Sequence, residues 1–145
     1  MKVAIGNDHA AVELKNAVVK YFEESGIEYV DFGCAAGEKC DYPDKAKEVC
    51  EAMLSGKADR AVLLCGTGVG ISISANKIKG IRAACCSDVF SAKYTRLHND
   101  ANVLCMGQRV VGEGLALELV DVFLNTSFEG GRHATRVDKI TALES

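Results

Sequence analysis

At 145 residues the chain is long enough to bury one hydrophobic core without a metal or a disulfide framework, so we expect a single domain over residues 1–145. Its hydrophobic fraction of 48% and charged fraction of 26% are ordinary for a globular protein. The net charge of −3, with no basic run, gives little support to nucleic-acid binding. The N-terminal segment soon becomes charged and helix-forming, so we expect neither a signal peptide nor a membrane span and predict a cytoplasmic protein.

Short apolar runs alternate along the chain with segments of helical periodicity. The expected strands, in chain order, are Val3–Ile5, Tyr29–Phe32, Ala61–Leu64, Ile81–Cys86 and Val103–Met106. The expected helices are Ala10–Ser25, Asp44–Ser55, Ile71–Lys77, Val89–His98, Glu113–Asn125 and Arg132–Glu144. This alternation predicts an α/β fold, a three-layer α/β/α sandwich with buried parallel strands. No strand follows the last helix, so we expect that helix to pack onto a second subunit.

The cysteines occur in an odd number, and none of them forms a CxxC pair. In a protein without an export signal, this pattern favours reduced thiols over a disulfide framework or a zinc site. We expect most of these thiols to be small core residues. The seven are Cys34, Cys40, Cys50, Cys65, Cys85, Cys86 and Cys105.

The segment Cys65-Gly66-Thr67-Gly68-Val69-Gly70 joins the third expected strand to the third expected helix. Three glycines at alternate positions let backbone N–H groups turn inward, and the following helix N-terminus adds unpaired donors, so this glycine loop suits an anion. Cys65 lies in the same positive field, which favours the thiolate and makes it a candidate base or nucleophile. The loop matches neither the dinucleotide fingerprint nor the P-loop. A tight turn without a ligand is the alternative.

Polar side chains stand where the loops of an α/β sheet gather around ligands. Asp8 and His9 follow the first expected strand, and His98 and Asn99 precede the fifth. No further histidine, cysteine or carboxylate stands at ligand spacing from the first pair, so we expect no metal site.

Three arginines are candidates for binding a phosphate. Arg132 and Arg136 are four residues apart, so they project from one face of the last helix, and Arg109 follows the fifth strand. The alternative is a solvated helix face on which Glu129 and Asp138 are the partners of the first two arginines.

Six segments, in order along nearly the whole chain, closely resemble the type B ribose-5-phosphate isomerases. They are Gly6–Ala10, Asp41–Pro43, Cys65–Ser72, Ala75–Lys77, His98–Val103 and Glu129–His133. Galactose-6-phosphate and allose-6-phosphate isomerases share that family. The resemblance implies a Rossmann-like five-stranded parallel sheet with an extra C-terminal helix, and no metal or organic cofactor. It also implies a homodimer, or a tetramer, in which active sites are shared between subunits.

The resemblance further implies an aldose–ketose isomerase that acts on a phosphorylated sugar through a cis-enediolate. It makes Cys65 the proton-transfer base, His98 the acid–base group that opens the sugar ring, and Thr67 a hydrogen-bond partner of the reacting oxygens. It places His98 and Asn99 opposite the partner's glycine loop. The substrate-binding residues it implies are Asp8, His9, Tyr42, Gly66, Thr67, Gly68, Val69, Gly70, Asn99, Arg109, Arg132 and Arg136.

The family has a second branch with a glutamate base, and Ile71 at that position assigns this chain to the cysteine branch. Ribose 5-phosphate is the favoured substrate, and allose or galactose 6-phosphate is the alternative. Val12, where an aromatic residue is common, bears on that choice. Two other classes stay open, which are a non-catalytic nucleotide-binding module and a redox sensor that uses Cys85 and Cys86.

Overall fold

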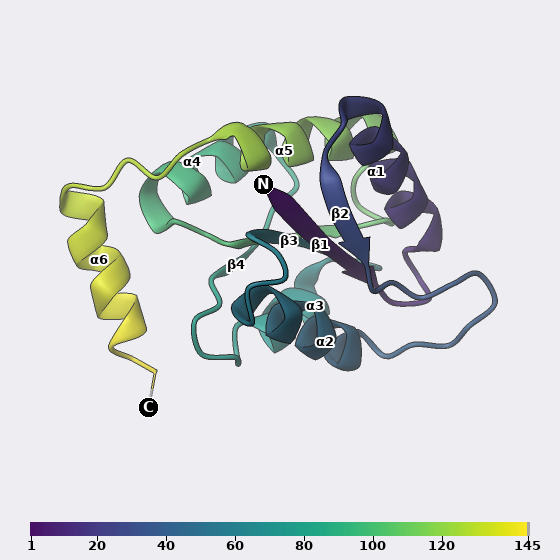
Figure 1. Ribbon diagram of the computed structural model, residues 1–145, viewed down its shortest axis with the longest axis horizontal. Coiled ribbons are helices and arrows are strands. Elements are labelled where there is room, and N and C mark those ends of the chain that lie inside the picture. The colour runs from purple at the N-terminus through teal and green to yellow at the C-terminus, as the bar shows by residue number, and fades with distance from the viewer. Residues whose placement is uncertain (145) are drawn as a thin grey trace.

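The computed structural model describes residues 1–144. Five parallel strands form one sheet in the order β2-β1-β3-β5-β4 (Figure 1). The strands are β1 (Lys2–Asn7), β2 (Glu28–Asp31), β3 (Arg60–Cys65), β4 (Ala83–Cys85) and β5 (Val103–Gly107). The helices are α1 (Val12–Ser25), α2 (Tyr42–Leu54), α3 (Val69–Ala75), α4 (Val89–Asn99), α5 (Glu113–Asn125) and α6 (Arg132–Thr141).

Helices cover both faces of the sheet (Figure 1). On one face α1, α4 and α5 build a core that includes Phe22, Ala92 and Phe123. On the other face α2 and α3 build a second core that includes Val49 and Ile71. Successive residues of a strand point to opposite faces, so β3 contributes to both cores. The predicted α/β/α sandwich is therefore confirmed.

Each predicted helix and strand is present, with small shifts at the ends. The helix α3 begins at Val69, two residues before the prediction, and α6 ends at Thr141, before Glu144. The prediction of five buried strands is wrong for β2 and β4, whose residues are partly or fully exposed. Both lie at the edges of the sheet, where a strand has one neighbour in place of two.

The order of the strands reverses between β1 and β3. The chain runs from β1 out to the edge strand β2 and then returns past β1 to β3. Ligands of open α/β sheets bind at such a reversal, because the loops on its two sides diverge and leave a crevice. The N–H of Asp8 donates to the carbonyl of Leu64 at 3.1 Å, which holds the end of β1 beside the end of β3. The fold thus brings the first polar cluster to the glycine loop.

The helix α6 projects from one end of the sandwich (Figure 1). It packs mainly on α4, and His133 is its one buried residue. Ile140 and Leu143 are exposed at its far end. No helix among residues 1–144 combines the length and the apolar character that crossing a membrane requires.

Backbone packs directly on backbone where the glycine loop crosses the end of β5. A Cβ on Gly107 would overlap the backbone of Thr67, and a Cβ on Gly68 would lie 2.8 Å from the carbonyl carbon of Met106. Gly68 also has a φ of +82°, a left-handed conformation that residues with a Cβ rarely adopt. Glycine is therefore required on both sides of this contact.

We expect Gly107→Ala to destabilise the protein by about 2 kcal/mol, because the backbone of Thr67 cannot rotate away as a side chain could. Its matched control is Gly114→Ala near the start of α5, where a Cβ meets nothing within 4 Å. That control should be as stable as the wild type or slightly more stable. Urea denaturation measures both changes, and equal stability of the two variants would contradict the contact at Gly107.

Candidate functional site

A hollow of about 380 Å³ opens at the carboxyl ends of β1, β3 and β5. The segments that follow these three strands therefore meet in space, although they are far apart in the sequence. The start of α2 closes a further side. The lining residues are Asp8, His9, Ala10, Cys40, Asp41, Tyr42, Cys65, Gly66, Thr67, Gly70 and Arg109.

Cys65 is the last residue of β3 and is only 3% exposed. Its Sγ accepts the N–H of Gly68 at 3.1 Å. Its carbonyl accepts the N–H of Gln108 at 3.0 Å, and the carbonyl of Gly66 accepts the N–H of Arg109 at 3.0 Å. These bonds fix the thiol relative to the loop and tie the loop to the segment after β5.

Two glycines of the loop make room for neighbouring side chains. A Cβ on Gly66 would lie 3.2 Å from a guanidinium nitrogen of Arg109, and a Cβ on Gly70 would lie 2.7 Å from the ring of Tyr42. Within residues 1–144, the amide N–H groups of these two glycines donate to no other atom of the chain. Both glycines line the hollow, so their amides are available to a bound oxyanion.

The remaining loop residues are Thr67, Gly68 and Val69, and they differ in how they relate to the hollow. The Oγ1 of Thr67 accepts the N–H of Val69 at 3.2 Å, which leaves the hydroxyl hydrogen of Thr67 to donate to a ligand. Gly68 is buried beneath the loop and Val69 is exposed, and neither lines the hollow. The geometry therefore gives no support to the expected direct contacts of Gly68 and Val69 with substrate.

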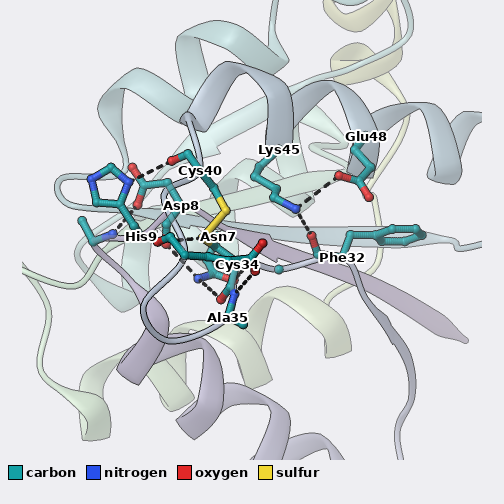
Figure 2. Close-up of a disulfide and its surroundings, with 12 residues drawn as sticks. Asn7, Asp8, His9, Phe32, Cys34, Ala35, Cys40, Lys45 and Glu48 are labelled. Carbon is teal, nitrogen blue, oxygen red and sulfur yellow. Dashed lines mark hydrogen bonds and ion pairs between the residues drawn. A yellow bond between two sulfur atoms is a disulfide. The ribbon is translucent and has the colours of Figure 1, made fainter.

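Asp8 and His9 are held in place by hydrogen bonds to backbone groups. The Oδ1 of Asp8 accepts the N–H of Ala10 at 2.9 Å, and Asp8 is only 7% exposed. The Nδ1 of His9 lies 3.0 Å from the carbonyl of Cys40 (Figure 2). Because a carbonyl only accepts, Nδ1 carries the proton and Nε2 is left for a ligand.

Cys34 and Cys40 form a disulfide in the segment between β2 and α2 (Figure 2). The prediction of seven reduced thiols is wrong at this pair. The signal that could have found it is the six-residue spacing around Gly37, whose φ is +83° and whose turn brings the two Cα atoms to 6.0 Å. In the chain-entropy model, closing so short a loop contributes about 2 kcal/mol of stability.

Asn7, the last residue of β1, was not among the predicted site residues. It is completely buried, and its side chain binds the backbone of Cys34 from both ends. The Oδ1 of Asn7 accepts the N–H of Cys34 at 3.0 Å, and Nδ2 donates to the carbonyl of Cys34 at 3.3 Å. A buried polar residue at the end of a strand was the signal for this role.

The other cysteines are free. Burial raises the pKa of Cys50 to about 12 and that of Cys86 to about 11, and it raises the pKa of Cys105 well above its usual value. These three are protonated core residues, as the sequence predicted. Cys85 is exposed at the edge strand β4, so the expectation that it lies in a buried strand is wrong.

His98 and Asn99, at the end of α4, lie outside the hollow that contains Cys65. They line a separate hollow of about 350 Å³. The ring of His98 stacks on that of His133 from α6, with centroids 4.0 Å apart and planes 11° apart. The carboxylate of Glu129 lies 3.8 Å from the Nε2 atom of each ring.

The cluster of His98, Glu129 and His133 places metal-ligating atoms within 4.8 Å of one another, a proximity that the sequence analysis missed. Imidazole binds a metal in the plane of its ring. Two rings stacked at 11° cannot both direct Nε2 at one ion, so this arrangement does not fit a metal.

Arg132 and Arg136 are exposed on α6 and line no hollow described here. Among residues 1–144 neither forms an ion pair, and Glu129 instead approaches the two histidines. The alternative in which Glu129 and Asp138 neutralise the arginines is therefore not observed. A further hollow of about 800 Å³, between the end of α6 and the segment before β4, contains Asn99 but no other predicted site residue.

Burial, and then the neighbouring His98 and Arg132, lower the pKa of His133. In the unfolded chain His133 takes up a proton at about pH 6.5, whereas in the folded chain it takes up that proton only at lower pH. Stability is therefore lost as the pH falls below that value. We expect wild type to lose more stability than His133→Gln between about pH 7 and about pH 5, measured by urea denaturation. Parallel pH profiles would contradict the shift.

An open parallel sheet with a fixed thiol, a buried carboxylate and unbonded amides at its strand reversal defines an α/β protein that binds a small anionic ligand. The model of the Ribose/Galactose Isomerase family matches residues 3–140. Ribose-5-phosphate isomerase B of Escherichia coli (strain K12) is 50% identical over 143 residues, which cover 99% of this chain and 96% of that protein.

A second relative, D-erythrulose-4-phosphate isomerase of Pectobacterium atrosepticum, is 44% identical over 141 residues, which cover 97% of this chain and 93% of that protein. The solved structure of Clostridium thermocellum Ribose-5-Phosphate Isomerase B superposes with a TM-score of 0.97 at 51% identity, and covers 99% of this chain and 97% of that one. The chain therefore belongs to the Ribose/Galactose Isomerase family and is a sugar-phosphate isomerase.

Proposed function

We propose that this chain, acting as one domain in the cytoplasm, interconverts ribose 5-phosphate and ribulose 5-phosphate with Cys65 as the proton-transfer base. One observation carries the proposal. The sulfur of Cys65 shares a hollow with the hydroxyl of Thr67 and with the unbonded amides of Gly66 and Gly70. A base stands beside donors that can stabilise the oxyanion which proton removal creates.

The open-chain aldose reacts by moving one proton from C2 to C1 and another from the C2 hydroxyl to the oxygen on C1. The thiolate of Cys65 removes the proton from C2, and the electrons of that C–H bond form the C1–C2 double bond while the C1 carbonyl oxygen becomes negative. The amides of Gly66 and Gly70 and the hydroxyl of Thr67 stabilise this enediolate. The thiol then returns the proton to C1, the C2 hydroxyl passes its proton to the negative oxygen on C1, and the ketone forms at C2. The step needs no oxidant, because the two carbons exchange oxidation states.

The hollow of one chain does not contain every group that the reaction needs. It contains Arg109 and His9 to bind the phosphate, but not His98, which we assign to ring opening. We propose a homodimer in which His98, Asn99 and the arginines of α6 complete the hollow of the other subunit. The exposed, unpaired arginines on a helix that covers little of its own chain support this arrangement.

The identity of the sugar is tested by turnover with a panel of sugar phosphates. Val12 does not line the hollow. The hollow therefore offers no contact through which Val12, in place of an aromatic residue, would change the choice of sugar. Because one relative is named for a four-carbon substrate, turnover should be measured with erythrulose 4-phosphate, ribose 5-phosphate, allose 6-phosphate and galactose 6-phosphate. A higher kcat/KM for any of the others would replace ribose 5-phosphate as the substrate.

We expect Cys65→Ser to lower kcat by about 10²–10⁴, because a serine hydroxyl is a far weaker acid than a thiol and supplies little base at neutral pH. KM should change little. The control is Cys50→Ala, which removes a thiol that lines neither this hollow nor that of His98 and should retain activity. Near wild-type turnover by the Cys65 variant would remove it as the base.

Shared sites predict that two inactive variants restore each other. In a mixed dimer of Cys65→Ser and His98→Asn, one hollow receives both intact residues and the other receives neither. Random refolding of an equal mixture should give about one quarter of wild-type activity, since half of the dimers are mixed and each has one working site. Sites built within single chains would give no recovery when activity is assayed after co-refolding.

A further inference from the structure

The disulfide between Cys34 and Cys40 is built into the wall of the hollow. The segment between β2 and α2, residues 32–41, contains neither helix nor strand. At its end, Cys40 and Asp41 line the hollow together with Cys65. Figure 2 shows the disulfide close to Asp8 and His9. A change in this segment would therefore alter the side of the site that holds His9.

The two arms of the segment are anchored very differently. The first arm is held by the side chain of Asn7 on Cys34 and by the Nζ of Lys45, which donates to the carbonyl of Phe32 at 2.8 Å (Figure 2). Among residues 1–144, Cys40 itself is held by the disulfide and by the hydrogen bond from His9. Its neighbours have backbone anchors of their own, since the carbonyl of Asp41 accepts the N–H of Lys45 at 3.3 Å and a carboxylate oxygen of Glu38 accepts the N–H of Ala35 at 2.9 Å. Without the disulfide, the hydrogen bond to His9 would be the one remaining contact of these that is made by Cys40 itself.

The two cysteines of the disulfide differ in their exposure to solvent. Cys34 is completely buried, whereas Cys40 is partly exposed and residues 35–39 between them are all exposed. An attacking thiolate can thus reach the sulfur of Cys40 and leave the sulfur of Cys34 as the departing group. The exposed residues of the turn can move without breaking a helix or strand.

We propose that this disulfide is a thiol–disulfide exchange site, through which a dithiol reductant weakens the binding of the sugar phosphate. The proposal rests on the proposed function for its substrate and for its compartment. Reduction releases Cys40, its carbonyl moves away from Nδ1 of His9, and His9 loses the bond that orients it in the hollow. The base, Cys65, is already a free thiol and is unchanged.

The exchange balances in two steps. One thiolate of the reductant attacks the sulfur of Cys40, the disulfide bond breaks, and Cys34 leaves as a thiolate that takes up a proton. The second thiol of the reductant attacks the mixed disulfide, which forms the reductant's own disulfide and releases Cys40 as a thiol. Two electrons pass from the dithiol to the protein.

The expected compartment favours a switch over a static brace. Glutathione and thioredoxin keep cytosolic thiols reduced, so a disulfide in a mesophilic cytosolic protein is usually transient or redox-sensing. A site that binds more tightly when oxidised would connect sugar-phosphate isomerisation to the supply of reductant.

The test compares one protein in two redox states. Oxidised and dithiothreitol-treated wild type are separated from reagent and checked by thiol titration in denaturant, which should give five and seven thiols. We expect reduction to raise KM for ribose 5-phosphate by about fivefold, the effect of one hydrogen bond, with kcat nearly unchanged. Amide hydrogen exchange should become faster at residues 35–42 in the reduced form.

The matched control is the double variant Cys34→Ser/Cys40→Ser, whose KM should equal that of reduced wild type and ignore dithiothreitol. Wild type that isomerises ribose 5-phosphate with the same KM in both states would overturn the proposal. So would a protein that titrates seven thiols after oxidation. If neither state turns over any sugar phosphate, the proposed function fails instead, and equal amide exchange at residues 35–42 in the two states would then overturn the redox site.

Discussion

The site depends on the direct contact between the backbone of the glycine loop and the end of β5. Gly107 allows the backbone of Thr67 to lie where a side chain would otherwise be. The backbone N–H groups of Gln108 and Arg109, which follow β5, then donate hydrogen bonds to the carbonyls of Cys65 and Gly66. A single close approach therefore sets the position of the thiol and, through the bond from Arg109 to Gly66, that of the arginine.

The same fold leaves the positive charge unevenly distributed. The hollow contains the carboxylate of Asp8 beside Arg109, whereas the arginines of α6 are exposed and unpaired among residues 1–144. A phosphate dianion is bound well only where several donors converge, because each exposed contact contributes little in water. The helix that carries the arginines also covers little of its own sheet. Both observations support the proposed dimer, in which a second copy of the chain would meet this surface.

Much of the fold followed from the sequence, because alternating apolar runs and helical periods are local signals. The glycine loop, Asp8 and His9 converged as predicted, since parallel strands place their following loops at one edge of the sheet. What the sequence did not give was the order of the strands, the exposure of Cys85 and the pairing of Cys34 with Cys40. The strand order and the exposure of Cys85 depend on contacts between distant segments, whereas the pairing of Cys34 with Cys40 depends on the conformation of the turn between them. The odd number of cysteines was also misleading. It argues against a framework in which all cysteines are paired, but it does not exclude a single disulfide within a short loop.

The cysteines show how one side chain acquires different chemistry from its surroundings. Burial in apolar cores keeps Cys50, Cys86 and Cys105 protonated, and this protects them from oxidants, since the thiolate is the reactive form. Cys65 is buried as well, but a backbone N–H meets its sulfur and a hollow opens beside it. An isomerase that uses a thiol base is open to oxidation at that base. In the proposed redox site, a second, more exposed sulfur pair responds to reductant, so that the binding of substrate would follow the redox state while Cys65 remains a thiol in both forms.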